Sequence, residues 1–236
     1  MSRPHLILMT LSFYSMSDNA RPKRRYDAAR RQARARENHA RIIESAAQMF
    51  LEHGYAGATI PAIAAHAGVA VETVYRAASG KAGLLAAAVQ VALAGSAERA
   101  QQPVEEREGI RRVIEEPDAR RQLFACAATQ PGVWSRVGPL LRVLDEGAAA
   151  DDELAELKRT HDRQRHSGLR RFAQLLADRG ALRADLTVDH ATDVLWALAA
   201  QANFEALVTS RGWTHHEYRE WLGRTLADVL LSPPEA

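Results

Sequence analysis

The chain has 236 residues, which is enough for one or two domains that bury a hydrophobic core. Apolar residues make up 47% of it and charged residues 25%, a composition that excludes a disordered protein. The single cysteine, Cys126, excludes an internal disulfide and a cysteine-based zinc site within the chain. The uncharged stretch at residues 82–97 falls short of the roughly 18 to 20 apolar residues that a membrane-spanning helix needs.

The charge is unevenly distributed along the chain. Residues 21–36 contain eight basic residues and one acid, which gives this basic arm a net charge of +7. The whole chain carries +2 and residues 1–20 cancel, so residues 37–236 carry −5. A basic arm on an acidic body favours a polyanion as partner, with Arg24 and Arg25 among the candidate contacts. A solvated tail explains the same charge, and residues 1–36 are expected to form a disordered extension.

The first residues give little information about function. Leu6–Tyr14 is a short apolar run after a single arginine, which makes a poor signal peptide because it lacks a charged first region and a small-residue cleavage site. Met1, Met9 and Met16 are all possible start positions.

From Arg36 onward, the spacing of apolar residues predicts helices. The first is expected at residues 36–53 and to end at Gly54, because glycine readily adopts a positive φ. Thr59 is a good N-cap for a second, short helix that closes at Gly68. A third helix is expected at residues 71–78, after a tight turn.

Two short helices joined by a tight turn that contains glycine form the helix-turn-helix arrangement. Small residues at Ala64, Ala65 and Gly68 allow the helices to cross closely. Helical hairpins occur in any helical protein, but the short helices, the Ala-Gly-Val turn and the basic arm together favour DNA binding. In the third helix, Val74 is expected to face inward. The residues expected outward or at the edge are Glu72, Thr73, Tyr75 and Arg76.

The helical pattern continues to the carboxyl terminus. A fourth helix is predicted from near Lys81 to about Ala100, and the polar segment 101–109 is a candidate domain boundary. Further helices are predicted at residues 117–129, 133–146, 151–179, 188–211 and 215–231, separated by breakers such as Pro131-Gly132. No segment alternates as a strand does, so the predicted fold is all-α with about nine helices.

The stretch from Ala40 to Leu85 resembles the DNA-binding domain of TetR-family transcriptional regulators. The residues that carry the resemblance are Phe50, Gly54-Tyr55, Thr59, Ile63-Ala64, Ala67-Gly68-Val69, Thr73-Val74-Tyr75, Lys81 and Leu84-Leu85. More loosely, Val208–Trp213, Tyr218 and Trp221-Leu222 are similar to the last helices of many members. The resemblance implies a DNA-binding domain at residues 37–97, with its helix-turn-helix at about 59–78, and a helical regulatory and dimerisation domain at 98–236.

The resemblance also implies a homodimer that binds a palindromic double-stranded DNA operator, with the third helix of each subunit in the major groove. Thr73, Tyr75 and Lys81 fall at positions that contact phosphate or nearby base edges in the family. Glu72 and Arg76 fall at variable positions that would read sequence, because glutamate accepts from cytosine N4 and arginine forks onto guanine. Thr59 and Val71, with Arg24 and Arg25 of the arm, complete the expected DNA contacts.

The sequence departs from the family at Ala77-Ala78, where an aromatic residue or histidine followed by phenylalanine is usual. The second alanine removes a core ring, and an unfilled hole of that size costs about 3 to 5 kcal/mol, so we expect its neighbours to have repacked. The departure keeps a second hypothesis open: a helical ligand-binding or interaction protein whose degraded DNA-binding head no longer reads operators.

Two sets of residues in the carboxyl-terminal half have roles that the resemblance implies. The expected dimer interface consists of Val194, Leu198, Ala202, Trp221, Leu222, Leu226 and Val229, although the same stripes would also serve to close the core of a monomer. The candidate lining of a ligand pocket is Phe124, Trp134, His161, Arg165, Trp196 and Asn203, several of which are the kind of residue found in any core. An unknown small hydrophobic effector would release the repressor from its operator.

Nothing in the sequence supports catalysis. It has no glycine-rich phosphate loop, no nucleophile elbow and no His-Glu-x-x-His motif, and its histidines lack metal-ligand spacing. We therefore expect no enzyme activity, no cofactor, no metal and no membrane partner. The expected location is the cytoplasm, in association with the nucleoid.

Overall fold

The computed structural model describes residues 21–232, apart from the side chains of residues 21–29, 31 and 32. The expectations for Leu6–Tyr14 and the three methionines therefore lie outside the described residues. The chain divides at His39 into two compact units. The domain bounds expected at residues 97 and 98 remain a prediction.

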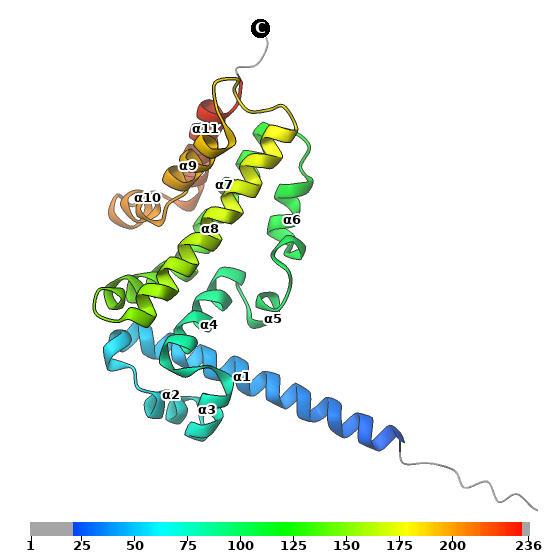
Figure 1. Ribbon diagram of the computed structural model, residues 1–236, viewed down its shortest axis with the longest axis vertical. Coiled ribbons are helices and arrows are strands. Elements are labelled where there is room, and N and C mark those ends of the chain that lie inside the picture. The colour runs from blue at the N-terminus through cyan, green and yellow to red at the C-terminus, as the bar shows by residue number, and fades with distance from the viewer. Residues whose placement is uncertain (1–20, 233–236) are drawn as a thin grey trace, which may run out of the picture. The chain divides into compact units, whose positions relative to one another are not determined.

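The described residues form an all-α fold, as expected from the sequence (Figure 1). They contain no strand, and one isolated bridge joins Leu182 to Leu231. Among them, no single helix has the length and apolar character to cross a membrane. Only the pair α3 (Val71–Ala77) and α4 (Gly80–Ala94) meets that criterion when taken together, and the two are bent by 60° relative to each other.

Helix α1, Arg21–Gly57, begins earlier than the sequence pattern indicated. The expectation that residues 21–36 are disordered is wrong, because the backbone is helical from Arg21 onward. All nine residues from 28 to 36 are alanine, arginine or glutamine, which are strong helix formers even where the arginine charges repel one another. At its other end, Gly54 has φ 66° and ψ 177°, so the regular helix stops at the residue predicted to end it.

Three short helices follow α1. Helix α2 covers Ile60–Ala67, α3 covers Val71–Ala77, and α4 covers Gly80–Ala94. Helix α4 ends earlier than predicted, at Gly95 with φ 87°, and the short α5 (Ala97–Ala100) takes up the rest of that segment. A 3₁₀ turn, η1 (Val104–Glu106), then leads into α6 (Glu108–Glu115), a helix that the polar composition of residues 101–109 did not indicate.

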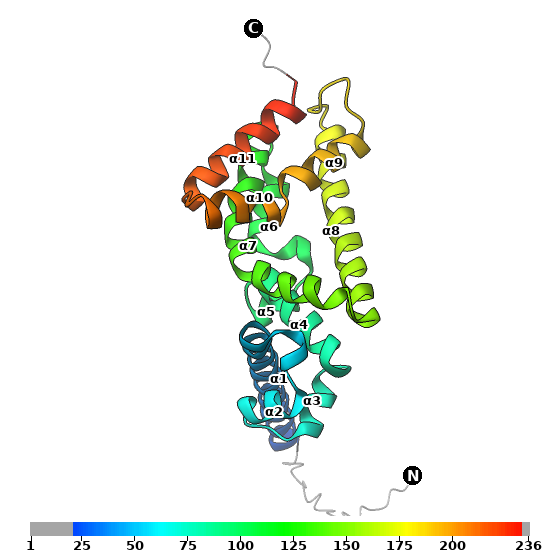
Figure 2. The same cartoon turned by 90° about the vertical axis from the view of Figure 1, so that its left-hand side faces the viewer.

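Helix α7, Ala119–Ala148, corrects the predicted break at Pro131-Gly132. It runs on through Pro131 and Pro139, although each proline removes one helical hydrogen bond and an interior proline costs about 3 kcal/mol. Eleven of its residues are buried, on both sides of Pro131, so the packing of the whole helix outweighs that loss. Figure 2 shows that α7 bends between its two halves, as expected of a helix with internal prolines.

The carboxyl-terminal helices follow the sequence prediction except at one interruption between residues 198 and 201. Helix α8 covers Asp152–Asp178, close to the predicted 151–179, and α11 covers His215–Leu230. The single helix predicted at residues 188–211 is wrong: α9 (Val188–Leu198) ends, and after Ala199 and Ala200 the chain continues as α10 (Gln201–Phe204) and a π-helical segment, η2 (Glu205–Ser210).

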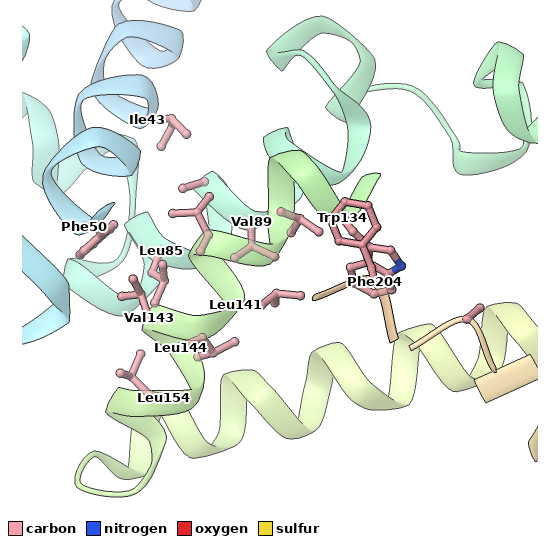
Figure 3. Close-up of a cluster of buried hydrophobic side chains, with 14 of the residues drawn as sticks. Ile43, Phe50, Leu85, Val89, Trp134, Leu141, Val143, Leu144, Leu154 and Phe204 are labelled. Atoms are coloured by element: carbon pink, nitrogen blue, oxygen red, sulfur yellow. The ribbon is translucent and has the colours of Figure 1, made fainter. Parts of the chain in front are cut away.

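The core of residues 40–232 is centred on α7, which packs against α4, α8 and α11. Figure 3 shows part of it, with Ile43 and Phe50 from α1, Leu85 from α4, Trp134 from α7 and Phe204 from α10 in one continuous cluster. The amino-terminal helices and the carboxyl-terminal helices thus share a core, so a change in packing around α7 can reach both.

Candidate DNA-binding interface and regulatory helices

The α2–α3 pair has the geometry of a helix-turn-helix. The Ala62 N–H donates to the Thr59 side-chain oxygen over 3.3 Å, which confirms Thr59 as the N-cap of α2. Gly68 has φ 63°, a left-handed conformation that suits glycine, and it turns the chain into α3. Ile63 and Ala67 of α2 and Val74 of α3 are buried, so these side chains hold the two helices together.

Helix α3 exposes the face expected to read DNA. Tyr75 is 59% exposed, and Glu72 and Arg76 also lie at the surface. The Arg76 guanidinium donates to the Thr73 hydroxyl over 3.1 Å, which holds it along the helix. Val71 and Thr73 are half-buried. Because Val74 is buried in the core, the opposite face of α3 points its hydrogen-bonding side chains toward solvent.

Lys81 is held by the end of α1. Its ammonium donates to the Tyr55 carbonyl over 2.7 Å and lies 4.2 Å from the centre of the Tyr55 ring. That ring stacks on Phe50 at 5.9 Å. Burial raises the pKa of Tyr55 to about 12, and the charges of Asp151 and Glu153 act in the same direction. An ammonium has three N–H donors, so Lys81 keeps two for another acceptor.

The two alanines that depart from the family sit at the junction of α3 and α4. Ala77 and Ala78 are half-buried and pack against the core. A Cβ on Gly83 would lie 2.8 Å from the Ser79 hydroxyl and 3.6 Å from the Ala78 Cβ, so α4 approaches the end of α3 closely. The expected repacking around Ala78 remains a prediction.

The basic arm lies on α1. Arg34 and Arg36 are exposed, whereas the side chains of Arg24 and Arg25 lie outside the described part of the structure. The arm is thus a helical segment that displays arginines.

Four of the six residues expected to line a pocket lie together. Trp134, Arg165 and Trp196 come together: the Arg165 guanidinium carbon is 4.1 Å from the centre of the Trp196 ring and 5.7 Å from that of Trp134. Asn203 donates to the carbonyls of Ala197 and Leu198, beside this group. Phe124 instead packs against Gly223 of α11. His161 lies on α8, and burial lowers its pKa.

Sequence reasoning missed Tyr218 and Gln201 as members of this region. Tyr218 is fully buried, its ring 5.4 Å from that of Phe204, and burial raises its pKa to about 12 while the Arg165 charge opposes this shift. Gln201 donates to the Gly138 carbonyl of α7 over 3.1 Å. Both are polar residues among apolar ones in the sequence. This pattern can mark a structural or functional role, because burying a polar group costs free energy unless it is hydrogen-bonded.

The residues expected at a dimer interface are not all available to a second copy. Leu222 and Leu226 are fully buried within the single chain, where they pack in the core shared with α7, so placing them at an interface was wrong. Ala202 is exposed. The remaining four are half-buried: Val194, Leu198, Trp221 and Val229.

No group of three or more histidine, cysteine or acidic side chains within residues 21–232 could hold a metal ion. Burial raises the pKa of the Cys126 thiol to about 12.

A helix-turn-helix followed by a larger all-helical part defines the fold of a helix-turn-helix transcriptional regulator. Residues 42–88 match the family described as bacterial regulatory proteins, tetR family. The resemblance read from the sequence is thus confirmed over these residues, and the chain has the fold of a TetR-family transcriptional regulator.

Solved structures share this fold at low sequence identity. NalD, the secondary repressor of the MexAB-OprM multidrug efflux pump in Pseudomonas aeruginosa, is 21% identical with a TM-score of 0.63, over 83% of this chain and 97% of that one. A TetR-family regulator from Mesorhizobium loti is 18% identical with a TM-score of 0.64, over 84% and 99%. FadR from Bacillus subtilis, solved with stearoyl-CoA, is 16% identical with a TM-score of 0.62, over 79% and 96%. A comparison of the sequence with curated proteins gave no match.

Proposed function

We propose that this protein is a homodimeric repressor that binds a palindromic DNA operator through α3 and is released from it by a small molecule. The observation that carries the proposal is the exposed face of α3, where Glu72, Tyr75 and Arg76 project from a helix fixed by the buried Val74. The match of residues 42–88 to the tetR family supports the same reading.

Each polar residue of this face has a role that its chemistry suits. Arg76 would fork onto guanine O6 and N7, and Glu72 would accept from cytosine N4. Phosphate would be bound by Thr73, Tyr75 and the two free N–H donors of Lys81. Thr59 and Val71 would contact the DNA backbone beside these phosphates. Arg24 and Arg25 of the arm would add charge along the duplex, as the arms of other DNA-binding proteins do.

The dimer would form through the half-buried apolar residues of α9 and α11. Val194, Leu198, Trp221 and Val229 present apolar surface that the single chain leaves partly uncovered, and Ala202 lies on α10 beside them. Leu222 and Leu226 are not part of this interface, since both are used inside the monomer. In an isologous dimer, the two α3 helices would lie about 34 to 36 Å apart, one DNA turn, to enter successive major grooves.

The proposed DNA contact is tested by gel shift with duplexes from the region upstream of the protein's own gene. Arg76→Ala should weaken binding to the preferred duplex by about 1 to 3 kcal/mol and relax its preference at one base pair in each half-site. Arg159→Ala, which removes another exposed arginine, on α8, is the control and should bind as the unchanged protein does. Equal affinity of both variants for every duplex would overturn the proposal.

A second candidate function is a helical ligand-binding or interaction protein that has lost operator recognition. The observation that favours it is Ala77-Ala78, which lacks the ring and phosphate contact usual in the family. This candidate predicts no preference among duplexes even in dilute buffer, so the same gel shift separates the two.

A further inference from the structure

The local sequence does not explain why the helix predicted at residues 188–211 is interrupted near its middle. Residues 197–203 read Ala-Leu-Ala-Ala-Gln-Ala-Asn, without glycine or proline, and alanine, leucine and glutamine are strong helix formers. The clearest departure from helical geometry is at Ala200, with φ −72° and ψ 148°, and α10 begins directly after it. Side-chain contacts must therefore stabilise the interruption.

Two side chains satisfy the carbonyls that the interruption leaves open. In a continuous helix, the carbonyls of residues 196–199 accept from the N–H groups of residues 200–203. Here the Arg165 guanidinium of α8 donates to the first and the last of these carbonyls, each over 3.1 Å. The Asn203 amide donates to the two between them, over 2.7 and 3.0 Å. Each of the four carbonyls thus has a side-chain donor in place of the backbone donor of a continuous helix.

The backbone N–H groups after the interruption have no such replacement. Within residues 21–232, those of Ala200, Gln201 and Ala202 donate to no carbonyl, and that of Asn203 donates to the Ala200 carbonyl over 3.2 Å. Two arrangements can therefore satisfy the same four carbonyls, one with side-chain donors and one with backbone donors. Only the second also gives these N–H groups acceptors within the chain.

Contacts from α7 and α8 hold the interrupted form. Gln201 donates to the Gly138 carbonyl of α7 over 3.1 Å and to the Glu205 carboxylate over 2.8 Å. Arg142 of α7 forms an ion pair with the same carboxylate. Arg165 belongs to α8, and α7 also packs against α4, the helix that follows α3. The helices of the core that lead to the helix-turn-helix thus also fix the interruption.

From this exchange of donors we infer that residues 188–204 form a two-state element. It is interrupted at Ala200 while Arg165 and Asn203 cap α9, and it becomes one continuous helix when they release the carbonyls. A released guanidinium needs another acceptor, and Asp162 lies three residues earlier on α8. Burial lowers the pKa of Arg165, and the charge of Asp162 already opposes this shift.

The two-state element carries part of the proposed dimer surface. Val194 and Leu198 belong to α9, and Ala202 belongs to α10. Their spacing of four residues would place all three on one face of a continuous helix, whereas the interruption separates Ala202 from the other two. A second copy that packs along this face favours the continuous form, because it binds that form better. This last step rests on the proposed function, which supplies the homodimer.

Hydrogen exchange of single backbone amides in the full chain tests the inference. Asn203→Ala removes both amide donors to the α9 carbonyls and introduces a strong helix former. The amides of Gln201 and Ala202 should then exchange at least about tenfold more slowly than in the unchanged protein, because they donate to these carbonyls. Gln174→Ala, which removes an exposed amide from α8, is the control and should leave both rates unchanged.

Proline at position 202 separates the two forms. Residue 202 is the second residue of α10, and α2 begins in the same way, with an N-cap ψ of 149° and Pro61 as its second residue. In a continuous helix, proline at 202 removes one helical bond and clashes with the carbonyl of residue 198. The double variant Ala202→Pro/Asn203→Ala should therefore restore fast exchange at Gln201. Ala202→Ser/Asn203→Ala is the matched control and should keep exchange slow.

Arg165→Met tests the other half of the cap. It removes both guanidinium bonds and should slow exchange at Gln201 and Ala202 as Asn203→Ala does. The arginine is half-buried, so circular dichroism must show that this variant is folded. Asn203→Ala carries the test if it is not.

Unchanged exchange at Gln201 and Ala202 in Asn203→Ala would overturn the inference, and so would slow exchange that persists with proline at 202. Analytical ultracentrifugation tests the dimer step separately. Asn203→Ala should lower the dissociation constant of the dimer at least about threefold, because the form competent to dimerise becomes more populated. A dissociation constant that does not fall rejects that step alone. Hydrogen exchange needs no DNA, so a failed gel shift would reject operator recognition and leave the two-state element intact.

Discussion

The Lys81 ammonium donates to the Tyr55 carbonyl over 2.7 Å while it lies over the ring of the same residue. One cation thereby ties the start of α4 to the end of α1. The contact thus links the two helices that flank α2 and α3 in the chain.

Lys81→Met should destabilise the protein by about 1 to 3 kcal/mol, because it removes a charged hydrogen bond and a cation–π contact from a partly buried site. Urea unfolding followed by circular dichroism measures the change. Lys158→Met is the control: its ion pair with Asp145 joins two side chains that are about half exposed and should contribute less than about 1 kcal/mol. Equal effects of the two substitutions would reject a special role for Lys81.

A second prediction concerns the contact between α7 and α11. A Cβ on Gly223 would lie 2.8 to 3.0 Å from the Phe124 ring, so Gly223→Ala forces this closely packed pair of helices apart. We expect a loss of about 1 to 3 kcal/mol in stability. The matched substitution Gly168→Ala, in the middle of α8, meets nothing within 4 Å and should instead stabilise the protein by about 0.5 to 1 kcal/mol. A scan of thermal unfolding that gives the same sign for both substitutions would contradict this packing.

A third prediction follows from the tyrosines. Burial raises the pKa of Tyr55 and of Tyr218 to about 12, whereas tyrosine in an unfolded chain ionises near 10. Above pH 10 the unfolded chain loses these protons and the folded chain keeps them, so the free energy of unfolding should decrease as the pH rises from about 10 to about 12. Urea unfolding at pH 9, 10 and 11 measures the decrease. It should be smaller when Tyr55 and Tyr218 are both replaced by phenylalanine; an identical pH dependence would show that other groups cause it.

The features that sequence predicted well are those set by local backbone chemistry. Thr59 caps α2 because its side-chain oxygen accepts from a backbone N–H three residues later. Gly68 takes a left-handed conformation because it has no side chain to oppose it. Val74 faces the core for the same kind of reason, since helical periodicity fixes which face of α3 is apolar.

The features that sequence missed depend on partners far along the chain. Helix α7 passes through Pro131 because packing of the whole helix outweighs one lost hydrogen bond. Helix α9 ends at Leu198, and the carbonyls of Trp196 and Ala199 at this end accept from Arg165, more than 30 residues earlier. Leu222 and Leu226 lie on a clear apolar stripe, but a stripe does not reveal whether its partner is the same chain or a second copy.

The last prediction tests the role of the basic arm. If a dimer neutralises about eight to ten phosphates, its affinity for DNA should fall by a factor on the order of 10³ to 10⁵ between 50 and 200 mM salt. Residues 21–36 carry seven net positive charges, and Arg34 and Arg36 are exposed, so deletion of residues 1–36 should flatten this dependence. Deletion of residues 1–20 removes no net charge and is the matched control. Gel shifts at a series of salt concentrations give the slope for each protein. Contact between the arm and DNA requires that the longer deletion reduces the slope and the shorter one does not. The slope depends on the number of phosphates that the protein neutralises, because binding releases their counterions, and it does not depend on the length of the chain.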